Sequence, residues 1–288
     1  MPKFQDRTWT SADGLTLYAR DYPAEAGPAV APVICIHGLT RNSRDFEVVA
    51  PHLAQQGRRV LAIDVRGRGR SDRSPNPLSY TPAAYAGDVI ALCEQAGIAR
   101  ALFVGTSMGG LITMTLAALR PDLVAGAALN DIGPEVAAAG LARIAGYVGG
   151  APPVTSWAEA AAYARHVNGH ALPGLTDAQW DAFARRIFRE DGGRFELDYD
   201  PAISQGFTAA PAGPAPDLWP LFAGLAIGRP MLLVRGATSD ILEADAADRM
   251  AQLAPHMARV DLAGVGHAPT LEEPEALAAL DALLDRAP

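Results

Sequence analysis

The fold is decided by one stretch of the sequence, Ala101-Leu-Phe-Val-Gly105-Thr-Ser107-Met-Gly109-Gly-Leu-Ile-Thr-Met114. An apolar run that predicts a buried strand leads into the motif G-x-S-x-G, and an amphipathic pattern that predicts a helix leads out of it. In this context the motif is typical of a nucleophile elbow, a tight strand-to-helix turn that lifts a serine hydroxyl clear of the backbone. Side chains at 105 and 109 would clash with the neighbouring strand and helix, so glycine is expected at both. Ser107 is therefore the candidate nucleophile.

Short apolar runs alternate with helical patterns along most of the remaining chain. Strands are predicted at 4–10, 15–22, 33–36, 60–63, 101–104, 124–129, 231–234 and 259–262, the first two forming a hairpin around Asp13-Gly14. Helices are predicted at about 43–56, 82–96, 108–119, 244–253 and 274–284. This alternation indicates an α/β fold with a mostly parallel sheet and helices on both of its faces.

One region interrupts the alternation. Three helical patterns follow one another at 135–148, 156–167 and 177–189, before a Pro/Gly-rich stretch at 209–216 and a short helix near 218–225. We predict a helical lid at 135–220, inserted between two strands of a core domain that consists of residues 1–134 and 221–288. Trp157, Trp180 and Trp219 fall in or at the end of this lid, where they either line an apolar pocket or form the lid's own small core.

Composition excludes several classes of protein. The 288 residues carry a net charge of −8, which argues against a nucleic-acid partner, because phosphate binding needs a clustered cationic face. The sole lysine, Lys3, lies at the N-terminus, so Schiff-base chemistry, pyridoxal phosphate and a P-loop are excluded. The pair His166 and His170 is broken by Asn-Gly and does not suggest a metal site.

The chain also lacks the signals of a membrane or secreted protein. No apolar run approaches the roughly 18 residues of a spanning helix, and the N-terminus has no apolar signal-peptide core. Cys35 and Cys93 lie in apolar surroundings and predict buried, reduced thiols. We expect a cytoplasmic protein with no membrane partner.

A serine nucleophile needs a base and an acid that orients it. His267 is the best candidate base, in a loop after the last predicted strand, at the sheet edge where open α/β proteins place their sites. Two aspartates follow predicted strands at the same edge. Asp240 is the preferred acid, because it gives the order Ser, Asp, His. Asp131 is the alternative candidate for the acid; its other possible role is a structural one, fixing the start of the lid.

The site also needs backbone N–H groups that bind an oxyanion. The N–H of Met108, directly after the nucleophile, is one candidate. The second is the N–H of Leu39 in the loop after the predicted strand 33–36. Gly38 permits a sharp turn there, and His37 is expected to orient the loop and not to transfer a proton.

Together these segments resemble the α/β-hydrolase family. The similar motifs are His37-Gly38, Asp64-Val-Arg66-Gly67-Arg-Gly69-Arg-Ser71, Gly105 to Gly109, Asp240 and Gly266-His267. The resemblance implies an eight-stranded, mostly parallel sheet and no cofactor. It also accounts for Arg66 and the glycines of its loop, and the other arginines between 66 and 73 are expected to form a solvated rim.

The identity of two residues narrows the activity that the resemblance implies. Ser107 stands where relatives that cleave epoxides or carbon–halogen bonds carry aspartate. Thr106 stands where relatives that hydrolyse carbon–carbon bonds often carry asparagine. We therefore expect a serine hydrolase that cleaves a small, largely apolar carboxylic ester or lactone through an acyl-enzyme. A carbon–carbon hydrolase and a slow-turnover ligand receptor remain as alternatives. The small-molecule substrate is the only partner expected, and the sequence does not predict an oligomeric state.

Overall fold

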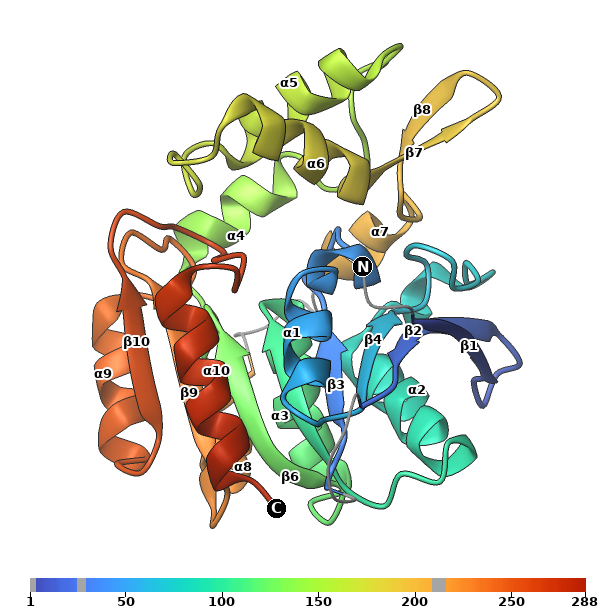
Figure 1. Ribbon diagram of the computed structural model, residues 1–288. Helices are drawn as coiled ribbons and strands as arrows, with labels where there is room; N and C mark the ends of the chain where they lie inside the picture. The colour runs from blue at the N-terminus through green and yellow to red at the C-terminus, as the bar shows by residue number, and fades with distance from the viewer. Residues whose placement is uncertain (1–3, 25–29, 209–215) are drawn as a thin grey trace.

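A single eight-stranded sheet runs through the molecule (Figure 1). The computed structural model describes residues 4–24, 30–208 and 216–288. The strands of the sheet are β1 (Gln5–Thr10), β2 (Thr16–Tyr22), β3 (Val33–Ile36), β4 (Val60–Asp64), β5 (Ala101–Thr106), β6 (Val124–Asn130), β9 (Met231–Gly236) and β10 (Ala258–Leu262). Their order in space is β1-β2-β4-β3-β5-β6-β9-β10, in which β2 runs antiparallel to both of its neighbours, β1 and β4, and the pairings from β4 to β10 are all parallel. The predicted α/β fold is confirmed.

The central strands are buried along their whole length. Every residue of β3, β4, β6 and β9 is buried, which explains why these strands read as continuous apolar runs and not as alternating ones. The N-terminal hairpin turns where the sequence predicts it, with Gly14 at a φ of +87°. The parallel strands therefore bring their carboxyl ends to one edge of the sheet.

Helices cover both faces of the sheet. They are α1 (Val49–Gln55), α2 (Pro82–Gln95), α3 (Met108–Leu119), α8 (Trp219–Ala226), α9 (Ala244–Leu253) and α10 (Pro274–Arg286). Side chains of α2, α3, α8 and α9 join one cluster of buried apolar residues, and those of α1 and α10 join the cluster on the other face. The helix predicted at 43–56 is two pieces, because a separate 3₁₀ turn (Ser43–Phe46) capped by Asn42 precedes α1.

Between β6 and β9 the chain leaves the sheet and forms a second layer at its carboxyl edge (Figure 1). This insert contains α4 (Ala138–Ala145), α5 (Trp157–Asn168), α6 (Asp177–Ile187), β7 (Phe188–Asp191), β8 (Arg194–Leu197) and α7 (Ile203–Thr208). It has its own cluster of buried apolar side chains, which includes Trp180 and Phe183. The three predicted helices are present: α4 and α6 are shorter than predicted, and α5 has the predicted length, shifted by one residue. The Pro/Gly-rich stretch at 209–216 lies almost wholly outside the described residues.

The antiparallel hairpin of β7 and β8 is missing from the sequence prediction, which continues the helix to Arg189 and assigns no element between there and residue 209. Gly192 and Gly193 make the turn, with φ of +56° and +80°. Two consecutive glycines at positive φ match the twist of a two-residue hairpin, so this dipeptide was the available signal.

Within the described ranges, no helix is long and apolar enough to cross a bilayer.

Candidate active site

Ser107 occupies a strained turn between β5 and α3. Its φ of 51° and ψ of −113° lie outside the regions that a residue with a side chain prefers. A Cβ added to Gly105 would lie 2.5 Å from the carbonyl carbon of Gly109, and one added to Gly109 would lie 2.1 Å from the carbonyl oxygen of Ile36. These are the clashes that the sequence predicts, so the two glycines let the helix pack close enough to hold the strained serine.

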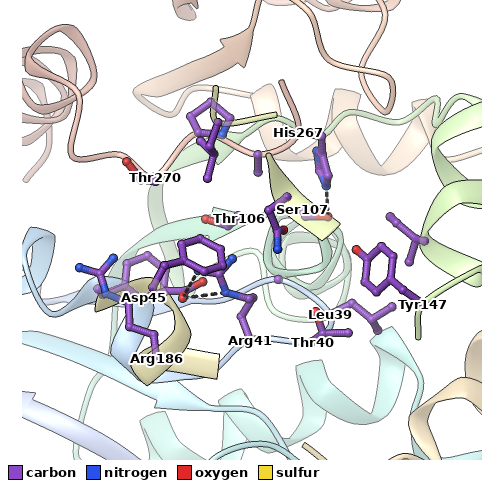
Figure 2. Close-up of a pocket in the computed structure, with 18 residues that line it drawn as sticks. Leu39, Thr40, Arg41, Asp45, Thr106, Ser107, Tyr147, Arg186, His267 and Thr270 are labelled. Atoms are coloured by element: carbon purple, nitrogen blue, oxygen red, sulfur yellow. Dashed lines mark hydrogen bonds and ion pairs between the residues drawn. The ribbon is translucent and has the colours of Figure 1, made fainter. Parts of the chain in front are cut away.

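Three side chains from the ends of different strands form a hydrogen-bonded chain. The Nε2 atom of His267 lies 2.9 Å from Ser107 Oγ, and its Nδ1 atom lies 2.8 Å from Asp131 Oδ2. Figure 2 shows the imidazole pointing at the serine hydroxyl, with a dashed line between them. The His267 side chain is 8% exposed and that of Asp131 is fully buried. A base that contacts a hydroxyl on one nitrogen and a carboxylate on the other is the arrangement that activates a serine.

The surrounding loop fixes the Asp131 carboxylate. Its Oδ1 atom accepts the N–H of Gly236 at 2.8 Å, and its Oδ2 atom accepts the Ser239 hydroxyl at 2.6 Å. Asp131 directly follows β6 at a φ of +55°, and its own N–H donates to Val234 of β9. These bonds give the carboxylate one orientation, with Oδ2 towards His267.

The preference for Asp240 as the acid beside His267 is corrected by the structure. Arg143 of α4 donates to both Asp240 carboxylate oxygens, from Nε at 2.6 Å and from Nη2 at 2.8 Å. These hydrogen bonds lower the pKa of the Asp240 carboxyl. Asp240 does not face His267 because of the loop that follows β9. This strand ends at Gly236, and the next four residues place Asp240 beside α4. Ser239, one residue earlier, is the one that reaches Asp131.

His37 holds the peptide unit whose N–H belongs to Leu39. Its Nδ1 atom lies 2.7 Å from the carbonyl oxygen of Gly38, and its Nε2 atom accepts the N–H of Val65 at 3.0 Å. The proton therefore sits on Nδ1 and donates to the carbonyl. In a trans peptide the N–H points opposite to the C=O, so this bond also sets the direction of the Leu39 N–H. A Cβ on Gly38 would lie 3.8 Å from Ser107 Cβ, so glycine leaves the space beside the nucleophile open.

Arg68 lies inside the protein, contrary to the expectation of a solvated rim. It is 1% exposed, and Nε donates to the carbonyl oxygen of Leu39 at 2.9 Å while Nη1 donates to the Tyr85 hydroxyl at 2.9 Å. Its Nη2 atom lies 3.7 Å from the sulfur of Met108. Arg68 thus contacts both residues that carry the candidate oxyanion N–H groups. The repeat Arg-Gly-Arg-Gly-Arg gives no sequence signal that separates this buried arginine from Arg70, which is exposed.

Two cavities open beside Ser107. One cavity has a volume of about 70 Å³ and a mixed lining, which includes the polar residues Arg41, Asp45, Thr106, Tyr147, Asn168, Arg186, His267 and Thr270 and the apolar residues Phe46, Leu172 and Phe183 (Figure 2). We call it the polar cavity, because the charged side chains beside Ser107 lie in its lining and not in that of the second cavity. The apolar cavity has a volume of about 150 Å³ and is lined by Tyr80, Pro82, Tyr85, Met108, Leu111, Ile132, Val136, Leu141, Ile203 and Ile241. Leu39, Ser107 and Ile144 line both. The nucleophile therefore stands at the boundary between two chemically different spaces.

The tryptophans of the insert line neither of these cavities. Trp180 is 3% exposed within the insert's own cluster, and Trp157 packs edge-on against Phe195. Trp219 packs against Phe222 at the start of α8. Of the two readings that the sequence allows, packing within the protein is the one observed.

The described side chains form neither a metal site nor a reactive thiol. Among them, no three His, Cys, Asp or Glu residues are grouped so that they could hold a metal ion. Cys35 and Cys93 are buried and unpaired, as predicted. Burial raises the pKa of the Cys93 thiol to about 12, which keeps it protonated and unreactive.

Comparison with known proteins agrees with this geometry. Residues 31–274 match the sequence profile of a family described as having the alpha/beta hydrolase fold. The chain belongs to the α/β-hydrolase family. The structure superimposes on an α/β hydrolase from Novosphingobium aromaticivorans with a TM-score of 0.92 and 47% identity, over 99% of both chains.

Two relatives that cover most of this α/β hydrolase are named for hydrolytic activities. A 3-hydroxybutyrate-oligomer hydrolase of Cupriavidus necator is 36% identical over 88% of this chain and 87% of its own length. A 2-(acetamidomethylene)succinate hydrolase of Mesorhizobium japonicum is 29% identical over 82% of this chain and 81% of its own length. The family and the hydrolase class of the relatives are therefore clear.

Proposed function

We propose that this α/β hydrolase cleaves a small carboxylic ester through an acyl-enzyme. The observation that carries the proposal is the hydrogen-bonded chain from Ser107 through His267 to the buried carboxylate of Asp131. Asp131 takes the role for which the sequence prefers Asp240. Ser107, the first member of this hydrogen-bonded chain, lines two open cavities, so a substrate carbonyl can reach its hydroxyl.

The geometry supports a two-step reaction. Ser107 Oγ attacks the carbonyl carbon while His267 Nε2 takes its proton, and Asp131 stabilises the resulting imidazolium through Nδ1. The imidazolium then donates this proton to the leaving alcohol, which leaves the acyl group on the serine. Water attacks this ester with His267 again as the base, and the acid and the free hydroxyl are released.

The negative charge on the substrate oxygen is stabilised by backbone N–H groups. Those of Leu39 and Met108 are our candidates, and the second lies at the N-terminus of α3, where the helix dipole favours negative charge. Loss of one such donor typically raises the barrier by roughly 3 kcal/mol. His37 and Arg68 act on this step only indirectly, through the loop that carries Leu39.

The comparisons support an ester as the substrate. The relative named for hydrolysis of 3-hydroxybutyrate oligomers covers nearly the whole chain, and such oligomers are joined by ester bonds between short hydroxy acids. We further propose that residues 135–220 form a lid over the core of residues 1–134 and 221–288, because α4 and α7 contribute Leu141, Ile144 and Ile203 to the apolar cavity. The unpaired, buried thiols support a cytoplasmic location.

Labelling and turnover test the proposal together. A fluorophosphonate probe should label the purified protein, and para-nitrophenyl butyrate should be hydrolysed for many turnovers with a burst of nitrophenol at high enzyme concentration. Ser107→Ala should abolish both while circular dichroism shows the same fold. Labelling that persists in Ser107→Ala would contradict the nucleophile assignment, and a single turnover followed by no further release would favour the slow-turnover receptor.

A further inference from the structure

We infer that the two halves of the ester bind in the two separate cavities beside Ser107. The acyl half occupies the apolar cavity. The leaving alcohol occupies the polar cavity and carries a carboxyl oxygen that Arg41 binds, as in a hydroxy acid or its ester. This inference rests on the proposed function and names the substrate class of the same site.

The position of His267 decides which half enters which cavity. Its imidazole lines the polar cavity and is absent from the lining of the apolar one. Because Nε2 returns its proton to the leaving oxygen, the alcohol must depart into the space that the imidazole faces. Met108 lines only the apolar cavity, so the acyl group extends along the start of α3.

The apolar cavity fits a compact acyl group without charge. A cavity of about 150 Å³ lined by aliphatic side chains can hold a molecule of the size of benzene, which corresponds to an acyl chain of about four to six carbons. Of the two phenolic hydroxyl groups in its lining, that of Tyr80 donates to Asp200 at 2.5 Å, whereas that of Tyr85 accepts from Arg68 and keeps its own proton as a neutral donor. Among the described residues, the lining of this cavity includes no cationic side chain, so a carboxylate on the acyl half would be buried without an ionic partner, which is unfavourable.

Arg41 presents a fixed edge of its guanidinium to the polar cavity. Nε and Nη2 both donate to one oxygen of Asp45, at 2.9 and 2.6 Å, and the guanidinium stacks 4.0 Å from the centre of the Phe183 ring. Within the described ranges, the two N–H groups on Nη1 have no protein acceptor. Figure 2 shows Arg41 and Asp45 joined by dashed lines beside the cavity, below Ser107. A Cβ on Gly38 would lie 3.8 Å from both Arg41 Cγ and Ser107 Cβ, so the two side chains border the same open space.

The charges around the cavity favour Arg41 over Arg186 as the binding group. Arg186 donates to Glu47 and to Glu272, so two carboxylates surround one guanidinium. Among the residues that the structure describes, Arg41 pairs only with Asp45, which leaves a neutral pair with unused donors. Such a pair binds an oxygen acceptor by oriented hydrogen bonds more than by net charge, and a carboxyl oxygen on the alcohol fits this chemistry.

Matched chromogenic esters test the assignment of the two halves. The first substrate is para-nitrophenyl butyrate, and the second carries a carboxylate on the nitrophenol ring. The third carries the same carboxylate as its methyl ester, and the fourth is mono-para-nitrophenyl succinate, with the carboxylate on the acyl half. We expect the second and third to be hydrolysed with kcat/KM at least as high as the first, and the succinate about tenfold or more slower. The comparison of the second and third separates a charged from a neutral acceptor.

A variant pair tests the role of Arg41. In the double variant Arg41→Met, Asp45→Asn the guanidinium is removed without an unpaired carboxylate. The ratio of kcat/KM for the carboxylated ester to that for the plain ester should fall about tenfold, the effect of one hydrogen bond to a charged group. Arg185→Met removes an arginine on the outer side of α6 and should leave this ratio unchanged.

The outcomes separate this inference from the function on which it rests. No turnover of any ester, with no labelling of Ser107, contradicts the proposed function itself. Turnover in which the succinate is preferred, or in which the ratio is the same in wild type and the double variant, leaves the function intact and overturns the inference.

Discussion

His37 determines the direction of one proposed oxyanion donor through its tautomer. The proton must be on Nδ1 to bind the Gly38 carbonyl, and Nε2 must be bare to accept from Val65. Burial lowers the pKa of His37 to about 3, which keeps the imidazole in this neutral form. The residue is thus a fixed structural group, and its neutrality has a measurable consequence for stability.

The unfolding free energy should depend on pH through His37. The unfolded chain binds the imidazole proton below about pH 6.5 and the folded chain only near pH 3, so stability is lost as pH falls through this window. Relative to His37→Gln, which cannot titrate, the wild type should lose roughly 2–3 kcal/mol between about pH 7 and pH 4. Urea unfolding of both proteins at several pH values measures this difference. If the unfolding free energies of the two proteins change with pH in the same way across this window, His37 binds its proton in the folded protein as readily as in the unfolded one, which contradicts the prediction.

Asp131 and Asp240 show how far single residues can be assigned from sequence. Both follow strands at the same edge of the sheet, and the sequence rightly places both there. The choice between them depends on the length of the loop after each strand, and on Arg143, which binds Asp240 from 97 residues away along the chain. Arg68 is a similar case, because the residues that enclose its guanidinium include Leu39, Tyr85 and Met108, which are distant in the sequence.

At the scale of elements, the strand-to-helix units are predictable and the insert is only partly so. The central strands are buried along their whole length and therefore read as continuous apolar runs. The helices that pack on the sheet bury one face each and therefore show a helical apolar period. The insert's elements bury less. Its hairpin is short: β8 alternates polar and apolar residues over only four positions, Arg194 to Leu197, and β7 has a single apolar residue, Phe188, so the strand signal is weak.

The helix α4 is tied to the core by the ion pair of Arg143 and Asp240. Because the side chains are 26% and 31% exposed, solvent weakens the pair, but its two hydrogen bonds give it a defined geometry. A double-mutant cycle with Arg143→Met and Asp240→Asn should give a coupling of about 0.5–1 kcal/mol in the free energy of unfolding. Urea titration of the four proteins measures it. A coupling indistinguishable from zero would mean that α4 docks by its apolar contacts alone.

At the scale of the whole molecule, the active site is an assembly of distant segments. The order of motifs along the chain predicts that Ser107 and His267 meet, because parallel strands bring loops from far apart to one edge. The cavities are not predictable in this way. Ile132, Leu141, Ile203 and Ile241 come from both the core and the insert, and their approach depends on how the two layers pack. Substrate preference therefore follows from packing that sequence periodicity does not encode.

The kinetics of two aspartate variants test the central assignment most directly. With para-nitrophenyl butyrate as substrate, Asp131→Asn should lower kcat by about four orders of magnitude. The imidazole then loses the carboxylate that orients it and stabilises its protonated form. Asp240→Asn should change kcat by no more than a few-fold, with both variants checked by circular dichroism for an intact fold. A near wild-type kcat in Asp131→Asn, together with a collapse in Asp240→Asn, would contradict the relay from Ser107 through His267 to Asp131.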